Sequence, residues 1–314
     1  VEIDFSELKI FDSDGNQVDK RDTAYYNAES SLVITTQPLE DGVYTIASKV
    51  LSKVDGHLVH AAIIFGVGDV QIDASLLESQ EQSETTFIPE SIARFPGLVG
   101  QTVVLGGVIA SIAIWSTGQT RFKEQIALID SSFKAKFSKV IGFGVIAVFA
   151  SNFIMLAVQT WRLEVSPFDV IETTFGSTWL TRMILTIILI GIWFWIERKN
   201  QISFKTQLPM LVFALALIAT TTMMGHGAST EMAPPIILDY VHNLLSSIWI
   251  GGVIFLGFVI LPSITKLDAN VRDKITISLI PRFSGMIIFS LGILIITGPM
   301  LLWFLDSNVS SLTE

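Results

Sequence analysis

Residues 240–265 read YVHNLLSSIWIGGVIFLGFVILPSIT, a run of 26 residues without Asp, Glu, Lys or Arg. A helix needs about 20 apolar residues to cross a bilayer, so this run is long enough to span one. Four further stretches are equally free of charge, at residues 95–120, 140–161, 206–230 and 283–305. A sixth candidate, 179–196, is interrupted only by Arg182 near one end. The sequence therefore predicts an all-α polytopic membrane domain with six spans over residues 91–314.

Composition limits the possible chemistry. Half of the 314 residues are hydrophobic, 16% are charged and none is cysteine, whereas soluble domains carry about 25% charged residues. The lack of cysteine excludes disulfides and thiolate metal ligands. No Walker loop, GxSxG or HExxH motif is present, so we predict neither ATP-driven pumping nor enzymatic hydrolysis. With a net charge of −9 and only short basic clusters, a nucleic-acid partner is not expected.

Lysine and arginine gather in alternate loops between the predicted spans. The loops after the first, third and fifth spans carry 12 of the 20 basic residues: Arg121, Lys123, Lys134, Lys136, Lys139, Arg198, Lys199, Lys205, Lys266, Arg272, Lys274 and Arg282. Because cytoplasmic loops are enriched in Lys and Arg, we place these loops inside the cell. The expected protein is then a multi-pass protein of the cell membrane, with residues 1–90 and the C-terminus of this chain on the outer side.

The polar region before the first span has the pattern of a small β domain. Val43–Ser52 and Leu58–Val67 are rich in β-forming residues and are bounded by Asp-Gly turn signals. We predict an N-terminal β-sandwich over residues 1–74, joined to the membrane domain by a polar linker at 75–90.

A candidate metal motif lies in the turn between these two predicted strands. In extended chain Asp55 and His57 share one face, and carboxylate with imidazole suits divalent copper. His60 has the opposite parity. A plain Asp-Gly turn followed by an exposed histidine fits the same spacing, so the motif alone leaves both readings open.

Two histidines at the outer ends of neighbouring spans form the strongest signal for function. His226 follows the fourth span, and His242 lies in the fifth. An ionisable residue within a span is by default a candidate functional residue, and thioether sulfur selects Cu(I). The alternative is interfacial histidine bonded to backbone, with methionine facing lipid. The nearby methionines and carboxylates are Met223, Met224, Met232, Glu231 and Asp239.

The membrane domain contains an internal repeat. KFSKVIGFGVIAVFASNFIM at 136–155 and RFSGMIIFSLGILIITGPM at 282–300 share a pattern at an offset of 146 residues. Gly106-Gly107 and Gly251-Gly252 recur at an offset of 145. The first two spans thus repeat as the fifth and sixth, in the same direction. If the repeat unit has four helices, the full chain has eight spans, two of them after Glu314.

Small and polar residues in the spans predict contacts between helices. Six glycines are expected to permit close helix packing: Gly97, Gly100, Gly106, Gly107, Gly251 and Gly252. Asn152 and Gln159 lie in the second span, where they either line a path or form hydrogen bonds to a neighbouring helix.

The N-terminal residues resemble a known family. LEDGVYTIASKVLSKVDGHLVHAAIIFGVG at 39–68, with VEIDFSE at 1–7 and LKIFDSDGNQV at 8–18, is similar to the CopC family of copper-binding β-sandwiches. The resemblance implies that Asp55 and His57 are Cu(II) ligands. In that family an N-terminal histidine completes the site, but this chain begins at Val1, so we expect the domain to be incomplete.

Residues 91–305 resemble the CopD family of copper-transport membrane proteins. The resemblance rests on D-x-x-H-x₆-W-x-G-G at 239–252, on RFS at 282–284, on TG at 297–298 and on GHGA at 225–228. It implies that His226 and His242 bind copper. A CopC-like domain fused ahead of a CopD-like domain also occurs in YcnJ-like copper-uptake proteins.

These observations predict a copper-handling membrane protein that imports copper, with copper ions and the lipid bilayer as partners. We expect the outer domain to capture Cu(II) and the membrane domain to bind copper, as Cu(I), at its outer mouth. Two alternative functions stay open. In the first, the chain is an accessory subunit that stores copper or delivers it to a membrane metalloenzyme. In the second, the histidine pair ligates a haem for electron transfer.

Overall fold

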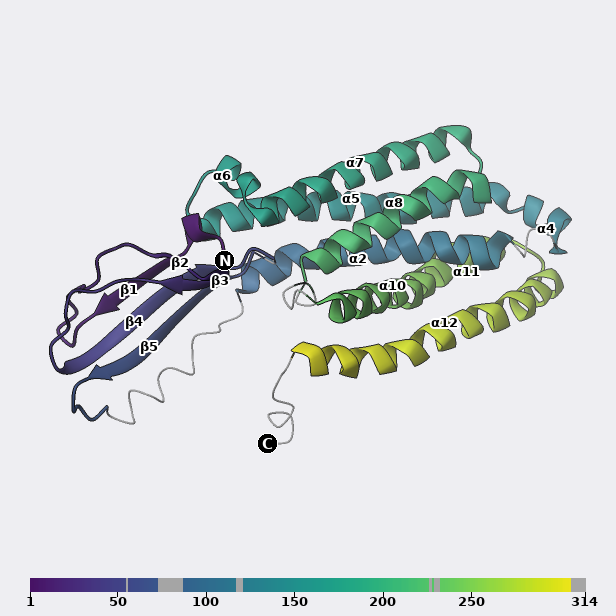
Figure 1. The fold of residues 1–314 in the computed structure, drawn as a ribbon. Coiled ribbons are helices and arrows are strands. Elements are labelled where there is room, and N and C mark those ends of the chain that lie inside the picture. Colours follow the sequence, from purple (N-terminus) through teal and green to yellow (C-terminus); the bar gives the residue numbers. More distant parts are fainter. Residues whose placement is uncertain (55, 73–86, 117–120, 226–227, 229–231, 306–314) are drawn as a thin grey trace. The chain divides into compact units, whose positions relative to one another are not determined.

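The computed structural model describes residues 1–54, 56–72, 87–116, 121–225, 228 and 232–305 (Figure 1). Asp55 and His226, two of the predicted metal ligands, lie outside the described residues. The chain divides into two compact units. Residues 1–88 with 159–175 form the first unit, which holds the strands, and residues 89–158 with 176–314 form the second, which holds most of the long helices.

The first unit contains two small antiparallel sheets. One has the strand order β1-β4-β5 and the other pairs β2 with β3. β4 pairs with β5 along its whole length, from Gly42 opposite Val67 to Leu51 opposite Leu58. The two strands predicted at 43–52 and 58–67 are therefore confirmed. The bounds are β1 (Glu7–Phe11), β2 (Ala24–Tyr26), β3 (Ala28–Val33), β4 (Gly42–Leu51) and β5 (Leu58–Val67), after a short 3₁₀ turn η1 (Ile3–Phe5).

Carboxylates order two loops of this unit. Asp12 accepts hydrogen bonds through Oδ1 from the backbone N–H of Asp14 at 3.0 Å and of Asn16 at 2.8 Å. Asp22 accepts from both the hydroxyl and the backbone N–H of Thr35, the latter at 2.9 Å. The hydrogen bond from the Thr35 side chain, together with that from its backbone, lowers the pKa of Asp22 below its ordinary value of 3.8.

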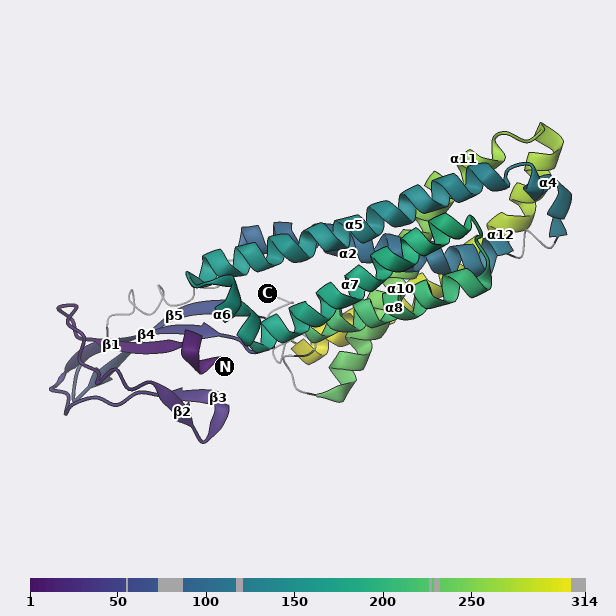
Figure 2. The same ribbon diagram turned by 90° about the horizontal axis from the view of Figure 1, so that it is seen from above.

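Six helices in the described part of the chain are long and apolar enough to cross a membrane, as the sequence predicts (Figures 1 and 2). In chain order they are α2 (Ile88–Ala110) continued by η3 (Ser111–Trp115), α5 (Asp130–Leu163), α7 (Thr174–Lys199), α8 (Phe204–Met223), α10 (Ala233–Phe255) continued by η4 (Leu256–Ile260) and α11 (Leu261–Ile264), and α12 (Ala269–Leu305). Two short helices, α4 (Lys123–Ala127) and α6 (Pro167–Glu172), lie in the connections.

The two repeats meet where α2 crosses α10. A Cβ atom added to Gly106 would lie 2.1 Å from the backbone oxygen of Ser247, and one added to Gly251 would lie 2.1 Å from that of Thr102. The Thr102 and Ser247 hydroxyl oxygens are 3.5 Å apart. Each glycine therefore admits the partner's backbone, as predicted for close packing of these helices. The contact is reciprocal, since each glycine packs against the backbone of the other helix. The two residues that supply this backbone, Thr102 and Ser247, are equivalent in the repeat, because they are 145 residues apart, as are Gly106 and Gly251.

A π-helical turn follows this crossing in both repeats. η3 occupies residues 111–115 and η4 occupies 256–260, again at an offset of 145. A π turn inserts one residue into a helix and is uncommon, so its recurrence at the same place supports the repeat independently of the sequence pattern.

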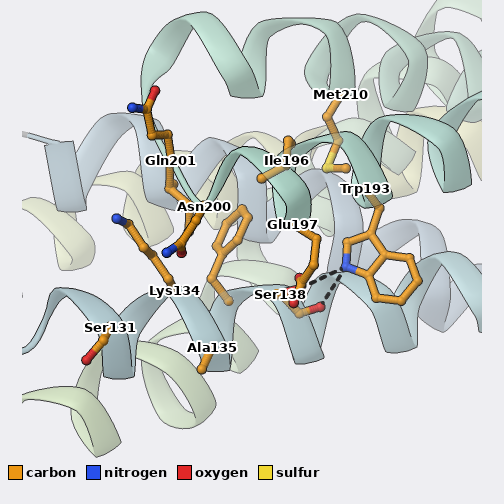
Figure 3. A pocket seen from close by; sticks show the side chains of 12 residues that line it. Ser131, Lys134, Ala135, Ser138, Trp193, Ile196, Glu197, Asn200, Gln201 and Met210 are labelled. Carbon is orange, nitrogen blue, oxygen red and sulfur yellow. Dashed lines mark hydrogen bonds between the residues drawn. The ribbon is translucent and has the colours of Figure 1, made fainter.

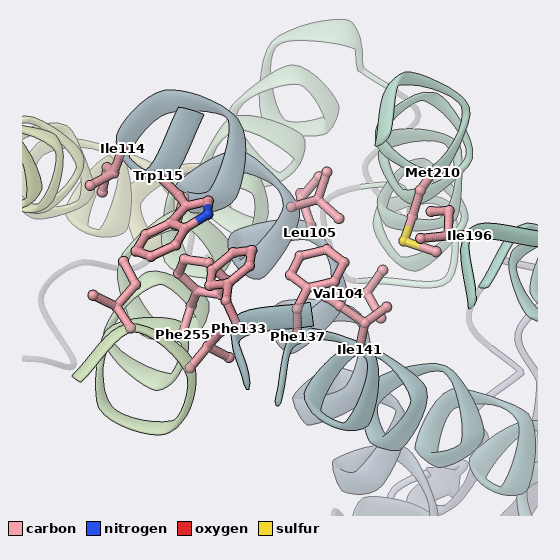
Figure 4. Close-up of a cluster of buried hydrophobic side chains, with 14 of the residues drawn as sticks. Val104, Leu105, Ile114, Trp115, Phe133, Phe137, Ile141, Ile196, Met210 and Phe255 are labelled. Carbon is pink, nitrogen blue, oxygen red and sulfur yellow. The ribbon is translucent and has the colours of Figure 1, made fainter. Parts of the chain in front are cut away.

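An aromatic cluster fills the core of the second unit beside the π turns (Figure 4). Trp115 stacks on Phe133 with ring centroids 4.0 Å apart. Phe255 meets Phe133 and Phe137 edge to face, at 6.0 Å and 6.1 Å. All four side chains are at most 1% exposed. These contacts join α5 to the ends of α2 and α10, and so hold the two repeats together.

Candidate metal centre

His242 lies on α10 and faces α12, the next helix of the second unit. Its Nδ1 atom is 2.9 Å from the hydroxyl oxygen of Thr297. Thr297 is 4% exposed, and its hydroxyl group also donates to the backbone oxygen of Leu294 at 3.4 Å. α10 and α12 pack along one another, so the contact is supported by the helices around it (Figure 1).

The hydrogen bond to Thr297 uses one ring nitrogen of His242 and leaves the other for a metal. The Thr297 hydroxyl lies 2.9 Å from His242 Nδ1 and 3.4 Å from the Leu294 carbonyl oxygen, and it has one hydrogen to donate. Because Nδ1 is engaged with Thr297, Nε2 is the ring nitrogen that points away from this contact. A metal-binding imidazole is commonly oriented in this way, by a hydrogen bond through its second nitrogen.

A carboxylate lies one helical turn before His242. Asp239 Oδ2 accepts a hydrogen bond from Asn243 Nδ2 at 3.0 Å. The same oxygen would lie 3.6 Å from a Cβ atom on Gly225. Gly225 directly precedes His226 in the sequence, so the segment that carries this second histidine starts beside the Asp239 carboxylate.

The end of α8, just before Gly225, is held by a charged pair on α2. Arg94 Nη1 donates to the backbone oxygen of Met224 at 3.2 Å. Arg94 Nη2 also contacts Glu90 Oε1 at 2.6 Å, and the Glu90 side chain is buried. The chain that enters the 226–231 segment is therefore bonded to α2 through Met224 and lies beside Asp239 of α10 at Gly225.

The three predicted methionine ligands differ in environment. Met224 is 7% exposed, whereas Met223 and Met232 are 46% and 47% exposed. Among the residues that the structure describes, no three of His, Asp or Glu form a group able to hold a metal ion. The structure thus brings Asp239 and His242 to one place on α10, next to the entry of the segment carrying His226.

In the first unit, His57 follows a tight turn and directly precedes β5. Its backbone oxygen accepts from Ser52 N at 2.9 Å, and Gly56 N donates to Ser52 O at 3.2 Å. The His57 side chain is half-buried, whereas His60 is exposed on β5. The side chain of His57 is therefore less exposed than that of a fully solvated turn residue. Its predicted partner, Asp55, lies outside the described residues.

Residues 159–175, in the same unit, secure this turn. Gln159 Nε2 donates to Gly56 O at 2.5 Å, and Arg162 Nη2 donates to Leu58 O at 2.6 Å. Gly56 has φ +69°, and an added Cβ atom would lie 2.8 Å from the Phe175 ring. Gln159 and Arg162 therefore hold the backbone on both sides of His57, a role that their sequence positions did not reveal.

The buried guanidinium of Arg182, on α7, was not predicted as a functional group. Arg182 is 8% exposed, and its donors contact oxygen atoms on α2, α5 and α8. Asn152 both accepts from Arg182 Nε at 3.0 Å and donates to Thr186 on α7 at 3.1 Å. The predicted interhelical hydrogen bond of Asn152 is thus confirmed. The only sequence signal for Arg182 was a charge inside a span.

A cavity of about 160 Å³ lies between α5, α7 and α8 of the second unit (Figure 3). Lys134, Glu197 and Asn200 line it, as does Trp193, whose indole N–H donates to both the backbone and hydroxyl oxygens of Ser138 at 3.0 Å. None of the predicted metal ligands lines this cavity. It is separate from the candidate metal centre.

Comparison with known families assigns both parts of the chain. Residues 1–68 match the CopC domain, and residues 91–236 match the copper resistance protein D-like, N-terminal domain. With the six membrane-spanning helices, these matches define a multi-pass membrane protein. The chain belongs to the family in which a CopC domain is fused to a CopD-like membrane domain.

One similar protein is the copper transport protein CutJ of Bacillus subtilis (strain 168). The two are 24% identical over 335 aligned residues, which cover 99% of this chain and 59% of CutJ. The chain therefore spans about three-fifths of the length of this curated relative. No solved structure matches the chain significantly.

Proposed function

We propose that this protein imports copper, and that His242 binds the ion at the outer mouth of the membrane domain together with His226 and neighbouring methionine. The clustering of Lys and Arg in the loops at the opposite end of the helices supports an outer location for this end. The outer domain captures Cu(II) through Asp55 and His57. The name of the relative CutJ as a copper transport protein supports the transport role.

The observation that carries this proposal is the hydrogen bond between His242 Nδ1 and Thr297. It holds the imidazole ring in one orientation and leaves Nε2 as the nitrogen for a metal. Asp239 adds a negative charge one turn away, which attracts a cation to the site. Thioether sulfur from Met223, Met224 or Met232 favours the cuprous state over divalent metals.

One double variant and a control test the proposal. His226→Ala combined with His242→Ala should abolish tight copper binding by the purified protein and copper uptake by cells that produce it. His60→Ala serves as the control, because it removes an exposed histidine of β5 and should leave both unchanged. Wild-type uptake in the double variant would refute the role of this histidine pair.

The same samples distinguish the alternative functions. Copper binding without uptake, together with co-purification of a membrane metalloenzyme, would favour the accessory role. A Soret absorbance band lost in the double variant would instead identify the histidines as haem ligands. For the outer domain, His57→Ala should reduce Cu(II) binding without changing Cu(I) binding by the membrane domain.

A further inference from the structure

The internal repeat gives Asp239, His242 and Thr297 counterparts in the first half of the membrane domain. At an offset of 145, His242 corresponds to Gly97 and Asp239 to Arg94. At the offset of 146 for the following span, Thr297 corresponds to Ser151. These counterparts also meet in space, because a Cβ atom on Gly97 would lie 2.6 Å from the Ser151 hydroxyl oxygen. The pair His242–Thr297 is thus repeated as Gly97–Ser151.

In the first repeat a guanidinium group lies beside this position. Arg182 Nη2 would be 3.6 Å from a Cβ atom on Gly97. The counterpart of the acidic Asp239 is the basic Arg94, so the sign of the charge is reversed between the two repeats. The histidine and the carboxylate of one repeat therefore correspond to a glycine and an arginine in the other, and a second arginine, Arg182, lies beside that glycine.

The oxygen atoms around Arg182 form a cage of the kind that binds a hard cation. Its donors reach the side chains of Gln101 and Asn152 at 3.0 Å each, of Thr220 at 3.1 Å and of Thr221 at 2.6 Å. Amide and hydroxyl oxygens suit alkali and alkaline-earth cations, and here they surround the guanidinium instead. Every acceptor of Arg182 within the described residues is neutral, so no carboxylate among them forms an ion pair with the guanidinium.

We propose that Arg182 acts as a tethered cation that keeps mobile cations out of the first repeat, so that only the second repeat admits a metal ion. A buried positive charge repels a second cation strongly, because water does not screen it. At about 6 Å and an effective dielectric constant of about 20, the repulsion lowers cation occupancy on the order of 100-fold. Arginine excludes cations and protons from other membrane pores by the same means. The inference rests on the proposed function, since the position is defined as the counterpart of His242.

Three variants separate the charge of Arg182 from its hydrogen bonds. Asn152→Asp keeps the shape and the guanidinium but places a carboxylate on its Nε, which cancels the charge. Arg182→Lys keeps the charge but loses the forked hydrogen bonds. Arg182→Gln removes the charge and keeps a polar group. The full-length chain is reconstituted in vesicles of phosphatidylethanolamine and phosphatidylglycerol, and potassium and proton fluxes are measured without copper.

If Arg182 excludes cations, potassium and proton fluxes should rise about 10-fold or more in Asn152→Asp and Arg182→Gln. Arg182→Lys keeps the charge, so its fluxes should equal those of wild type. The proposal would be overturned if Asn152→Asp and Arg182→Gln both gave wild-type fluxes while only the two Arg182 variants had lower melting temperatures. That result would show that Arg182 serves only to join helices. If Arg182→Gln does not fold, Asn152→Asp still decides, because it retains the arginine. Since no copper is present, failure of the proposed copper site would leave these fluxes unchanged.

Discussion

Replacing Thr297 by valine tests the orientation of His242 more sharply than removing the histidine itself. The substitution keeps the branched shape of the side chain but deletes the oxygen that lies 2.9 Å from His242 Nδ1. Without this oxygen, the ring orientation of His242 is no longer held. Loss of such a supporting hydrogen bond typically weakens metal binding 10- to 100-fold, or about 1.4–2.7 kcal/mol.

The fold should tolerate this change. Thr297 is 4% exposed, and its own donation to Leu294 O is long, at 3.4 Å, so valine fits the site with little loss. Loss of the hydrogen bond at His242 Nδ1 should lower the free energy of unfolding by about 1–3 kcal/mol in the metal-free protein. The melting temperature should fall modestly while the helical content is retained.

The assay is a competition titration of Cu(I) against a chromophoric chelator, carried out without oxygen on the purified protein. Thr297→Ser is the matched control, because it keeps the hydroxyl oxygen and should bind within about threefold of wild type. Wild-type affinity in Thr297→Val, with loss of binding in His242→Ala, would refute the argument that Thr297 orients His242. Wild-type affinity in both would remove His242 from the site.

Three further predictions concern the fold. Gly106→Ala should destabilise the protein by about 3 kcal/mol or more in reversible unfolding, because its Cβ would lie 2.1 Å from a backbone oxygen of α10; Gly292→Ala, with open space around it, should be neutral or slightly stabilising. Phe255→Ala should cost about 3–5 kcal/mol, since this ring is 0% exposed, whereas Phe258→Ala, at a ring 67% exposed, should cost far less in the same measurement. The lowered pKa of Asp22 means that its contribution to stability is complete above about pH 4 and is lost as the pH falls below that value, so hydrogen-exchange protection of the loop it anchors should fall with acid in wild type but not in Asp22→Asn.

Local patterns in the sequence predicted the helices and strands, because these depend on the hydropathy and turn preference of neighbouring residues. Six long apolar stretches became six helices long enough to span a membrane, since backbone groups in hydrocarbon must be satisfied within the helix itself. The Asp-Gly turn signals placed β4 and β5 to within one residue. The glycines at 106 and 251 were expected at helix contacts, and the structure shows that they contact each other's helices.

The candidate site was only partly predictable. His242 was identified from its chemistry and its place in a span, and Thr297 only as part of a resemblance to the CopD pattern. Their hydrogen bond joins residues 55 positions apart, which no local periodicity encodes. The roles of Gln159 and Arg162 at the His57 turn were missed for the same reason, because their partners lie more than 100 residues away.

The sequence by itself determined that this chain has a β domain ahead of six membrane spans and that its first and last helix pairs repeat. Because cysteine is absent, it also determined that any metal ligands come from histidine, methionine, carboxylate, amide or backbone groups. Hydropathy, composition and internal similarity are properties of the amino-acid sequence, so they can be read without knowledge of the tertiary structure. Only the tertiary structure decided that Thr297 contacts His242, that α2 and α10 cross at paired glycines, and that Arg182 lies beside Gly97, the counterpart of His242. Each of these depends on contacts between distant helices, and those contacts exist only once the helices have packed.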